Sequence, residues 1–113
     1  DERPVSLQGP YDLLVNINMI HIAPWEACQC LMKHAARILT TGATLFMYGP
    51  FLVKDREVAP SNLEFDQSLK SRNPSWGLRA LDQVAAEAEA QGLTLKQVVD
   101  MPANNLSVVF QRQ

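Results

Sequence analysis

Two nearly continuous apolar runs, separated by an amphipathic segment, set the strongest limit on how this chain can fold. Residues 11–17 and residues 43–48 are apolar at almost every position instead of alternating between apolar and polar. Strands with this pattern are covered on both faces and belong to parallel sheets. Because strand, helix and strand follow one another, the pattern predicts a right-handed parallel crossover. The fold class is therefore α/β.

The connecting segment has the pattern of an amphipathic helix. Pro24 suits the first turn of a helix, where a missing N–H leaves no hydrogen bond unmade. Apolar side chains then recur at steps of three and four residues: Trp25, Cys28, Leu31, Met32, Ala35, Ile38 and Leu39. We expect a helix of about four turns, which Gly42 is well placed to end.

Two further helices are expected after the second apolar run. Ser61 and Glu64 have the spacing of a capping box, which predicts a short helix over residues 61–71. A longer helix is expected over residues 79–91, with Gly92 as its C-terminal stop.

The last segments are expected to be strands. Residues 95–101 and 106–112 are joined by the short, turn-rich link 102–105, so they should be antiparallel neighbours. The architecture predicted is a four-stranded mixed sheet, two strands parallel and then an antiparallel pair, with helices on both faces. Residues 1–113 are expected to form one domain with one core, in which residues 1–10 are an N-terminal arm.

Charge and hydropathy exclude several classes of function. The net charge is -2, without a long run of either sign, so the chain has no electrostatic footprint for nucleic acid or an anionic membrane. No apolar stretch approaches the roughly 18 residues that span a bilayer, and the first residues lack the layout of a signal peptide. We therefore expect no nucleic-acid partner, no membrane and a cytoplasmic location.

The two cysteines are expected to be structural. Cys28 and Cys30 lie two apart on the expected helix, so their side chains point to different sides and an internal disulfide is disfavoured. Buried or half-buried thiols are the simplest interpretation. His34 is the one nearby ligand and does not complete a four-ligand shell, so no metal site is expected.

Four phrases in the sequence resemble one protein family. They are "NMIHIAPWEA" with the asparagines around it, "YGPF" at 48–51, "SNLEFDQSLKSRNPSWGLR" at 61–79 and "MPANNLSVVF" at 101–110. In this order the chain resembles the C-terminal half of proteins related to methyltransferase-like protein 26, which are similar to class I S-adenosylmethionine-dependent methyltransferases. The resemblance covers nearly everything from Tyr11 onward. It implies half of a Rossmann-like methyltransferase sheet.

The resemblance also implies that most of the cofactor platform is missing. In such folds a glycine-rich turn after the first strand and an acidic residue after the second hold the cofactor. The sequence has no G-x-G, and ten residues precede the first expected strand. We expect no cofactor for the isolated chain, with S-adenosylmethionine as the cofactor that the family implies.

Candidate site residues follow the first strand. Asn16, Asn18, Met19 and His21 lie at its carboxyl end, where polar groups of an α/β sheet point into the ligand crevice. By resemblance, residues 18–21 line the S-adenosylmethionine and acceptor pocket in a complete protein. His21 is the weak candidate for a general base, because its ordinary pKa of about 6.5 suits proton transfer near neutrality. The alternative is that these groups only cap the strand end and hydrogen-bond the loop.

A second set of candidates belongs to the acceptor side of the cleft by family analogy. These residues are Trp25, Tyr48, Gly49, Pro50, Asn104 and Asn105. Trp25 is more simply explained as an anchor in the core or at an interface. Tyr48, Gly49 and Pro50 are equally explained as a strand-to-loop exit, and the asparagines as turn residues in left-handed conformation. Asp66, Arg72 and Trp76 fall in what would be a lid, with ion pairing and packing as the simpler explanation.

Three functions remain open on these residues. The first is a truncated methyltransferase-like domain that is not catalytic alone and forms a homodimer, because strand 11–17 becomes an exposed apolar edge that templates pairing. The second is a methyltransferase whose cleft is completed by a second chain. The third is a small-ligand binding module that reuses the crevice of Asn18, His21, Tyr48 and Asn105.

Overall fold

A four-stranded mixed sheet organises the molecule. In the computed structural model, which describes residues 11–113, the sheet has the order β1-β2-β6-β5. Its strands are Tyr11–Ile17 (β1), Leu39–Gly49 (β2), Leu93–Met101 (β5) and Asn105–Arg112 (β6). β1 pairs parallel with β2, and β6 is antiparallel to both of its neighbours. The predicted mixed sheet is confirmed, while the arm expected over residues 1–10 lies outside the described residues.

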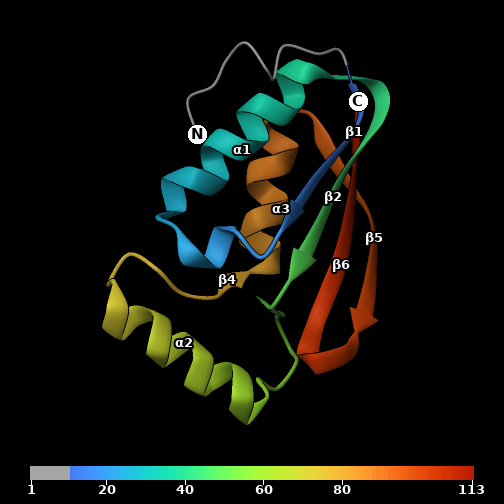
Figure 1. Cartoon of the computed structure of the whole chain (residues 1–113). Helices are drawn as coiled ribbons and strands as arrows, with labels where there is room; N and C mark the ends of the chain where they lie inside the picture. Colours follow the sequence, from blue (N-terminus) through green and yellow to red (C-terminus); the bar gives the residue numbers. More distant parts are fainter. Residues whose placement is uncertain (1–10) are drawn as a thin grey trace.

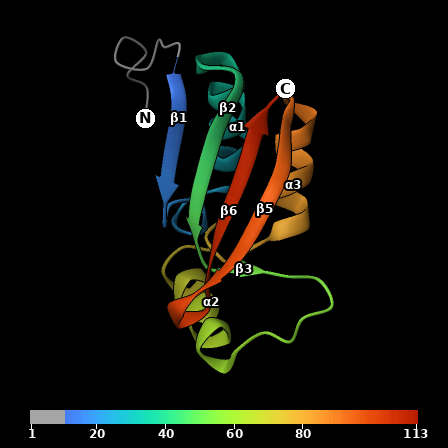
Figure 2. The ribbon, with the colours of Figure 1, turned by 90° about the vertical axis from the view of Figure 1, so that its right-hand side faces the viewer.

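The two crossover helices lie on one face of the sheet. Helix α1, Trp25–Ile38, and helix α3, Leu81–Ala90, contact each other behind the sheet in Figure 2. We expected helices on both faces of the sheet, but α1 and α3 share one face. The crossovers β1-α1-β2 and β2-α3-β5 both advance in the same direction across the sheet. Right-handed connections of that kind place their helices on the same side.

The core fills the layer between this helix pair and the sheet. Its fully buried side chains come from both helices and from the inner face of three strands: Met32, Ala35, Val84, Ala88, Leu45, Leu93, Val108 and Phe110. Alternate residues of β2 and β6 point the other way, as the two-residue period of a strand requires. The core therefore fixes β2 and β6, and it touches β1 through the half-buried Leu14.

Helix α1 ends earlier than the sequence indicated. The backbone N–H of Leu39 donates to the carbonyl of Ala35, and β2 begins at Leu39 without a loop. Gly42 was expected to end the helix; instead it lies inside β2 at φ 85°. Leu39 and Ala43, before and after Gly42, are both buried in β2, and Leu39 pairs with Tyr11.

Helix α2, Pro60–Arg72, lies apart from the other two helices, below the carboxyl ends of β1 and β2 (Figure 1). Its predicted capping box is wrong, because Ala59 is the N-cap, no side chain caps the helix, and Pro60 supplies the first-turn residue. The helix ends at Arg72, one residue after the predicted end, with Asn73 as its C-cap.

Helix α3 starts two residues later than expected. Arg79–Ala80 form a short strand, β4, which pairs with Phe51–Leu52, β3. Gly92 follows the helix at φ 84° and donates its N–H to the carbonyl of Glu89, so the predicted stop is confirmed. Within residues 11–113, no helix is both long and apolar enough to cross a membrane.

Candidate functional site

The carboxyl ends of β1 and β2 are held closely together. Asn18 follows β1 at φ 52°, a conformation that asparagine tolerates, and its N–H donates to the carbonyl of Tyr48 at 2.8 Å. Gly49 ends β2 so close to this loop that a Cβ there would lie 3.1 Å from Asn18 Oδ1 and 3.7 Å from His21 Cε1. The absence of a side chain at Gly49 therefore lets the loop after β1 sit against β2.

This loop carries a buried histidine. His21 lies in a short 3-10 helix, η2 (Ile20–Ile22), and is 3% exposed. Its ring makes an edge contact with Phe65 of α2, with 5.6 Å between the centroids and 63° between the planes. Burial, and then the charge of Arg79, lower the pKa of His21, so the ring is neutral near pH 7.

Arg79 fixes the position of that loop. Its guanidinium donates to the carbonyls of Ala23 at 2.7 Å, Ser75 at 2.8 Å and Ile20 at 3.3 Å. It also lies over the ring of Trp25, 5.6 Å from the centroid. Three carbonyls and an aromatic face hold the charge in place, and the carbonyl of His21 in turn accepts the N–H of Gly77 at 3.0 Å.

A cavity of about 540 Å³, which we call the His21 cavity, opens beside the histidine. Its polar lining consists of Asn18, His21, Ser61, Asn62, Asn104 and Asn105. Its apolar lining consists of Ile22, Pro50, Phe65 and Ala103. No lysine, arginine, aspartate or glutamate is among these residues, so the lining is uncharged and made mainly of amides and apolar surface.

Several residues predicted from the sequence meet in this cavity. Asn18, His21, Pro50, Asn104 and Asn105 all line it. They come from three separate places in the chain: the exit of β1, the exit of β2 and the turn between β5 and β6. Their roles in binding remain predictions, but the structure brings them together.

Two other acceptor-side candidates sit next to the cavity. Tyr48 does not line the cavity but contacts a residue that does: its hydroxyl accepts a hydrogen bond from Asn105 Nδ2 at 3.3 Å. Gly49 acts through the close backbone approach described above. Asn104 has the expected left-handed conformation at φ 61°; Asn105 does not, and Ala103 takes that conformation instead.

Three other predicted residues lie elsewhere. Asn16 is half-buried within β1, opposite Met47. Met19 packs against the core. Trp25 packs under Arg79 and lines a different cavity, between α1 and α3.

The expected lid residues hold the structure together and do not line the His21 cavity. Asp66 Oδ1 accepts the N–H of Leu78 at 2.8 Å, and Asp66 Oδ2 pairs with Lys70 at 3.0 Å. Arg72 is exposed and Trp76 half-buried. The simpler explanation, pairing and packing, accounts for Asp66.

Five lining residues were not predicted: Ile22, Ser61, Asn62, Phe65 and Ala103. Phe65 is an aromatic residue on a helix with almost no apolar face, and an aromatic side chain on such a polar helix is a signal that the sequence does offer. In the structure Phe65 is 37% exposed. Ser61 and Asn62 carry no such signal, since they reach the cavity through the docking of α2 below the sheet. Ile22 and Ala103 reach it from the 3-10 turns that follow β1 and β5.

The cysteines and possible metal ligands form no site within residues 11–113. Cys28 is buried and Cys30 exposed, and both thiols are free. Burial, and then the charge of Glu87, raise the pKa of the Cys28 thiol to about 11, against an opposing effect of Arg79. In this part of the chain no three His, Cys, Asp or Glu side chains gather closely enough to hold a metal ion.

The fold matches solved structures of methyltransferases. The mitomycin 7-O-methyltransferase matches with a TM-score of 0.81 and 18% identity over 93% of this chain and 30% of its own. Human N-acetylserotonin methyltransferase, solved in complex with SAM, matches at 0.78 and 13% identity over 94% and 31%. An O-methyltransferase family protein from Burkholderia thailandensis matches at 0.78 and 15% identity over 96% and 32%. The chain therefore has the fold of one part of a methyltransferase and spans about a third of the length of these structures.

A family model places the sequence more directly. The model described as "Protein of unknown function (DUF938)" matches residues 2–112, almost the whole chain. The chain, a methyltransferase-like domain in fold, therefore belongs to the DUF938 family.

Proposed function

We propose that this chain supplies the acceptor side of a methyltransferase cleft and does not transfer methyl groups on its own. The observation that carries the proposal is His21, a buried, neutral histidine in a cavity at the carboxyl ends of two parallel strands. Ligands of open α/β sheets bind at this end of the strands. A neutral imidazole that lines a cavity is suited to accept the proton of an acceptor hydroxyl.

The described residues do not fit S-adenosylmethionine as a complete ligand. The folds that the chain resembles use a glycine-rich turn and an acidic residue for this cofactor. No carboxylate and no glycine lines the His21 cavity, and the sequence has no G-x-G. We assign no step through the cofactor to this chain. The proposal is that a complete cleft needs further polypeptide, as in proteins related to methyltransferase-like protein 26.

Calorimetric titration with S-adenosylmethionine and S-adenosylhomocysteine tests this proposal. At protein concentrations that detect millimolar affinity, neither ligand should give a binding heat with the purified chain. Micromolar binding of either one would contradict the proposal, because it would mean that the chain already contains a working cofactor site.

We further propose that the chain forms a homodimer through β1. This strand is at the edge of the sheet, and Leu13, Val15 and Ile17 on it are 56%, 49% and 60% exposed. Antiparallel pairing of two copies about a two-fold axis would extend the sheet, pair the backbone groups of this edge, and place the apolar side chains of the two strands beside each other on one face. Light scattering should show a dimer at micromolar concentration, and a stable monomer under those conditions would rule it out.

A second candidate function, a methyltransferase completed by another chain, is favoured by one observation. Among residues 11–113 no strand pairs with the outer edge of β1, and this strand leads directly into Asn18 and His21. A strand docked on that edge would therefore end beside the His21 cavity. If the homodimer completes the site, the affinity for S-adenosylmethionine should rise with the dimeric fraction of the protein. Titrations at several protein concentrations separate this candidate from the first.

A further inference from the structure

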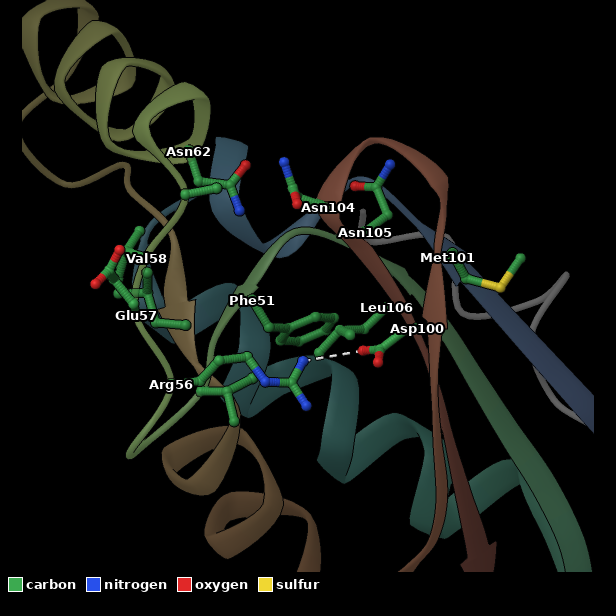
Figure 3. A pocket seen from close by; sticks show the side chains of 13 residues that line it. Phe51, Arg56, Glu57, Val58, Asn62, Asp100, Met101, Asn104, Asn105 and Leu106 are labelled. Carbon is green, nitrogen blue, oxygen red and sulfur yellow. Dashed lines mark hydrogen bonds and ion pairs between the residues drawn. The ribbon is translucent and has the colours of Figure 1, made fainter.

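A second cavity adjoins the His21 cavity. It measures about 470 Å³, and we call it the Phe51 cavity (Figure 3). Phe51 and Leu106, 6% and 4% exposed, form its buried side, and the loop 53–59 closes it opposite the β5–β6 turn. Each cavity alone has the size of a small-molecule pocket.

The two cavities meet at three asparagines. Asn62 on α2 and Asn104 and Asn105 on the β5–β6 turn line both of them. In Figure 3, Asn62 and Asn104 face each other across the upper opening of the Phe51 cavity. Asn104 Nδ2 already donates to Ser61 Oγ on α2 at 3.2 Å. Neutral amides therefore line the junction of the two cavities, and amide side chains can donate to a ligand or accept from it without adding charge.

The chemistry of the two cavities differs. The His21 cavity has no charged lining residue, so a charged group placed there would lose water without gaining a partner. The Phe51 cavity has an apolar buried side, formed by Phe51 and Leu106. Its charged lining residues, Arg56, Glu57 and Asp100, are all exposed. Arg56 and Asp100, whose side chains are 55% and 76% exposed, pair with each other at 2.9 Å. One cavity thus suits an uncharged hydrogen-bonding head and the other an apolar tail.

We propose that the two cavities form one binding cleft for an elongated acceptor, with an uncharged hydroxyl head beside His21 and an apolar tail against Phe51 and Leu106. This inference rests on the proposed role of the His21 cavity as the acceptor side. It adds the class of molecule: a neutral phenol or alcohol with a hydrophobic extension, and neither a carboxylate nor an amine at the reacting end.

Simple phenols test the proposal on the whole chain without any cofactor. Phenol and 4-butylphenol are titrated into the ¹⁵N-labelled protein and followed by NMR. Both should shift His21, and 4-butylphenol should also shift Phe51 and Leu106. Each fully buried methylene is worth about a factor of four in affinity, so a half-buried butyl chain should make 4-butylphenol bind about tenfold more tightly than phenol. The charged analogues 4-butylbenzoate and 4-butylbenzylamine should bind about tenfold more weakly than 4-butylphenol or worse.

Variants that fill the Phe51 cavity distinguish binding of the apolar tail from binding of the hydroxyl head. Val58→Trp, in the loop and half-buried, should abolish the tenfold gain and leave phenol binding unchanged, and the smaller Val58→Phe should give an intermediate loss. Ala86→Trp, exposed on α3 beside the distant Trp25 cavity, is the matched control and should leave both affinities unchanged. Circular dichroism verifies that each variant is folded.

The outcomes are separable. A butyl gain that survives in folded Val58→Trp, equal affinity for the charged analogues, or no binding of any phenol would each overturn the proposal. None of these results depends on S-adenosylmethionine. A cofactor that binds the isolated chain would contradict the proposed function, whereas failure of the tail effect with intact phenol binding at His21 would remove only the joined cleft.

Discussion

The two edge strands of the sheet, β1 and β5, both expose apolar side chains but differ in how they present them. On β5, Val98, Val99 and Met101 are 36% to 39% exposed. Its pairing with β6 shifts register between Leu95 and Gln97. Irregular register and charged groups near an edge discourage pairing with another chain.

On β1 the pairing is regular from Leu13 to Ile17, and the outward side chains are more exposed than those on β5. The charged residue of this strand, Asp12, lies at its start, where it accepts a hydrogen bond from Thr40 Oγ1 at 3.1 Å. The difference between the edges supports the proposal that β1, and not β5, is the strand that pairs with more polypeptide.

Each edge strand also leads to one wall of the His21 cavity. β1 leads to Asn18 and His21, and β5 leads to the turn that carries Asn104 and Asn105. A strand that docks on β1 would therefore act on the histidine wall, while the asparagine wall would stay as it is. The predictions below contrast the two sides.

The largest expected effect contrasts an inward residue of β5 with an outward residue of β1. Leu93→Ala should destabilise the chain by about 2–5 kcal/mol, because Leu93 is fully buried and its loss leaves a cavity. Leu13→Ala should change the stability of the monomer by less than about 0.5 kcal/mol. Urea unfolding of dilute protein measures both, with Leu93→Met as the volume-conserving control at below about 1.5 kcal/mol. A large loss in dilute Leu13→Ala would mean that β1 is already covered.

The next effect tests which edge associates. Val15→Lys places a charge in the middle of the β1 edge and should weaken self-association about 100-fold, since each copy would have to bury or approach a like charge. Val98→Lys does the same on β5, where the residue is 38% exposed, and should leave association within about twofold. Sedimentation velocity over a dilution series measures both. If Val98→Lys dissociates the protein and Val15→Lys does not, the assignment of the two edges is reversed.

This contrast also shows how far the sequence alone reaches. The apolar run at 11–17 predicted β1, and the short link at 102–105 predicted the β5–β6 pair, because both signals are local. The predicted helix end at Gly42 was wrong. A glycine after an amphipathic helix usually ends it, whereas the pairing of Leu39 with Tyr11 depends on residues far away in the chain.

The candidate site divides in the same way. Asn18 and His21 were found because they follow a recognisable strand end, and Asn104 and Asn105 because they form a turn. Asn62 and Phe65 were missed, since they reach the cavity through the docking of α2, which no periodicity in that polar helix predicts. These two residues join the site through long-range packing, which a local sequence pattern does not predict.

A smaller effect comes from the histidine wall at the end of β1. Because burial lowers the pKa of folded His21, the unfolded chain binds a proton that the folded chain does not as the pH falls below about 6.5. Stability should therefore be insensitive to this group above that pH and should decrease below it, until the folded ring also protonates. Urea unfolding between pH 8 and pH 5 should show the decrease, and His21→Gln should reduce it. His34→Gln, which removes the other histidine, is the control; an equal reduction there would contradict the assignment to His21.

The smallest expected effect concerns the ion pair at the end of β5. Arg56 Nη1 and Asp100 Oδ1 lie 2.9 Å apart, but the two side chains are 55% and 76% exposed, so water and salt screen their attraction. Arg56→Ala and Asp100→Ala should each cost about 0.2–1 kcal/mol, and the double variant should cost little more than either one. Thermal unfolding at low and at high salt measures this, and the difference from the wild type should shrink as salt increases. The pair restrains the loop 53–59 beside β5 and does not hold the sheet together. A loss of stability as large as that expected for Leu93→Ala would show instead that the β5 edge depends on this loop.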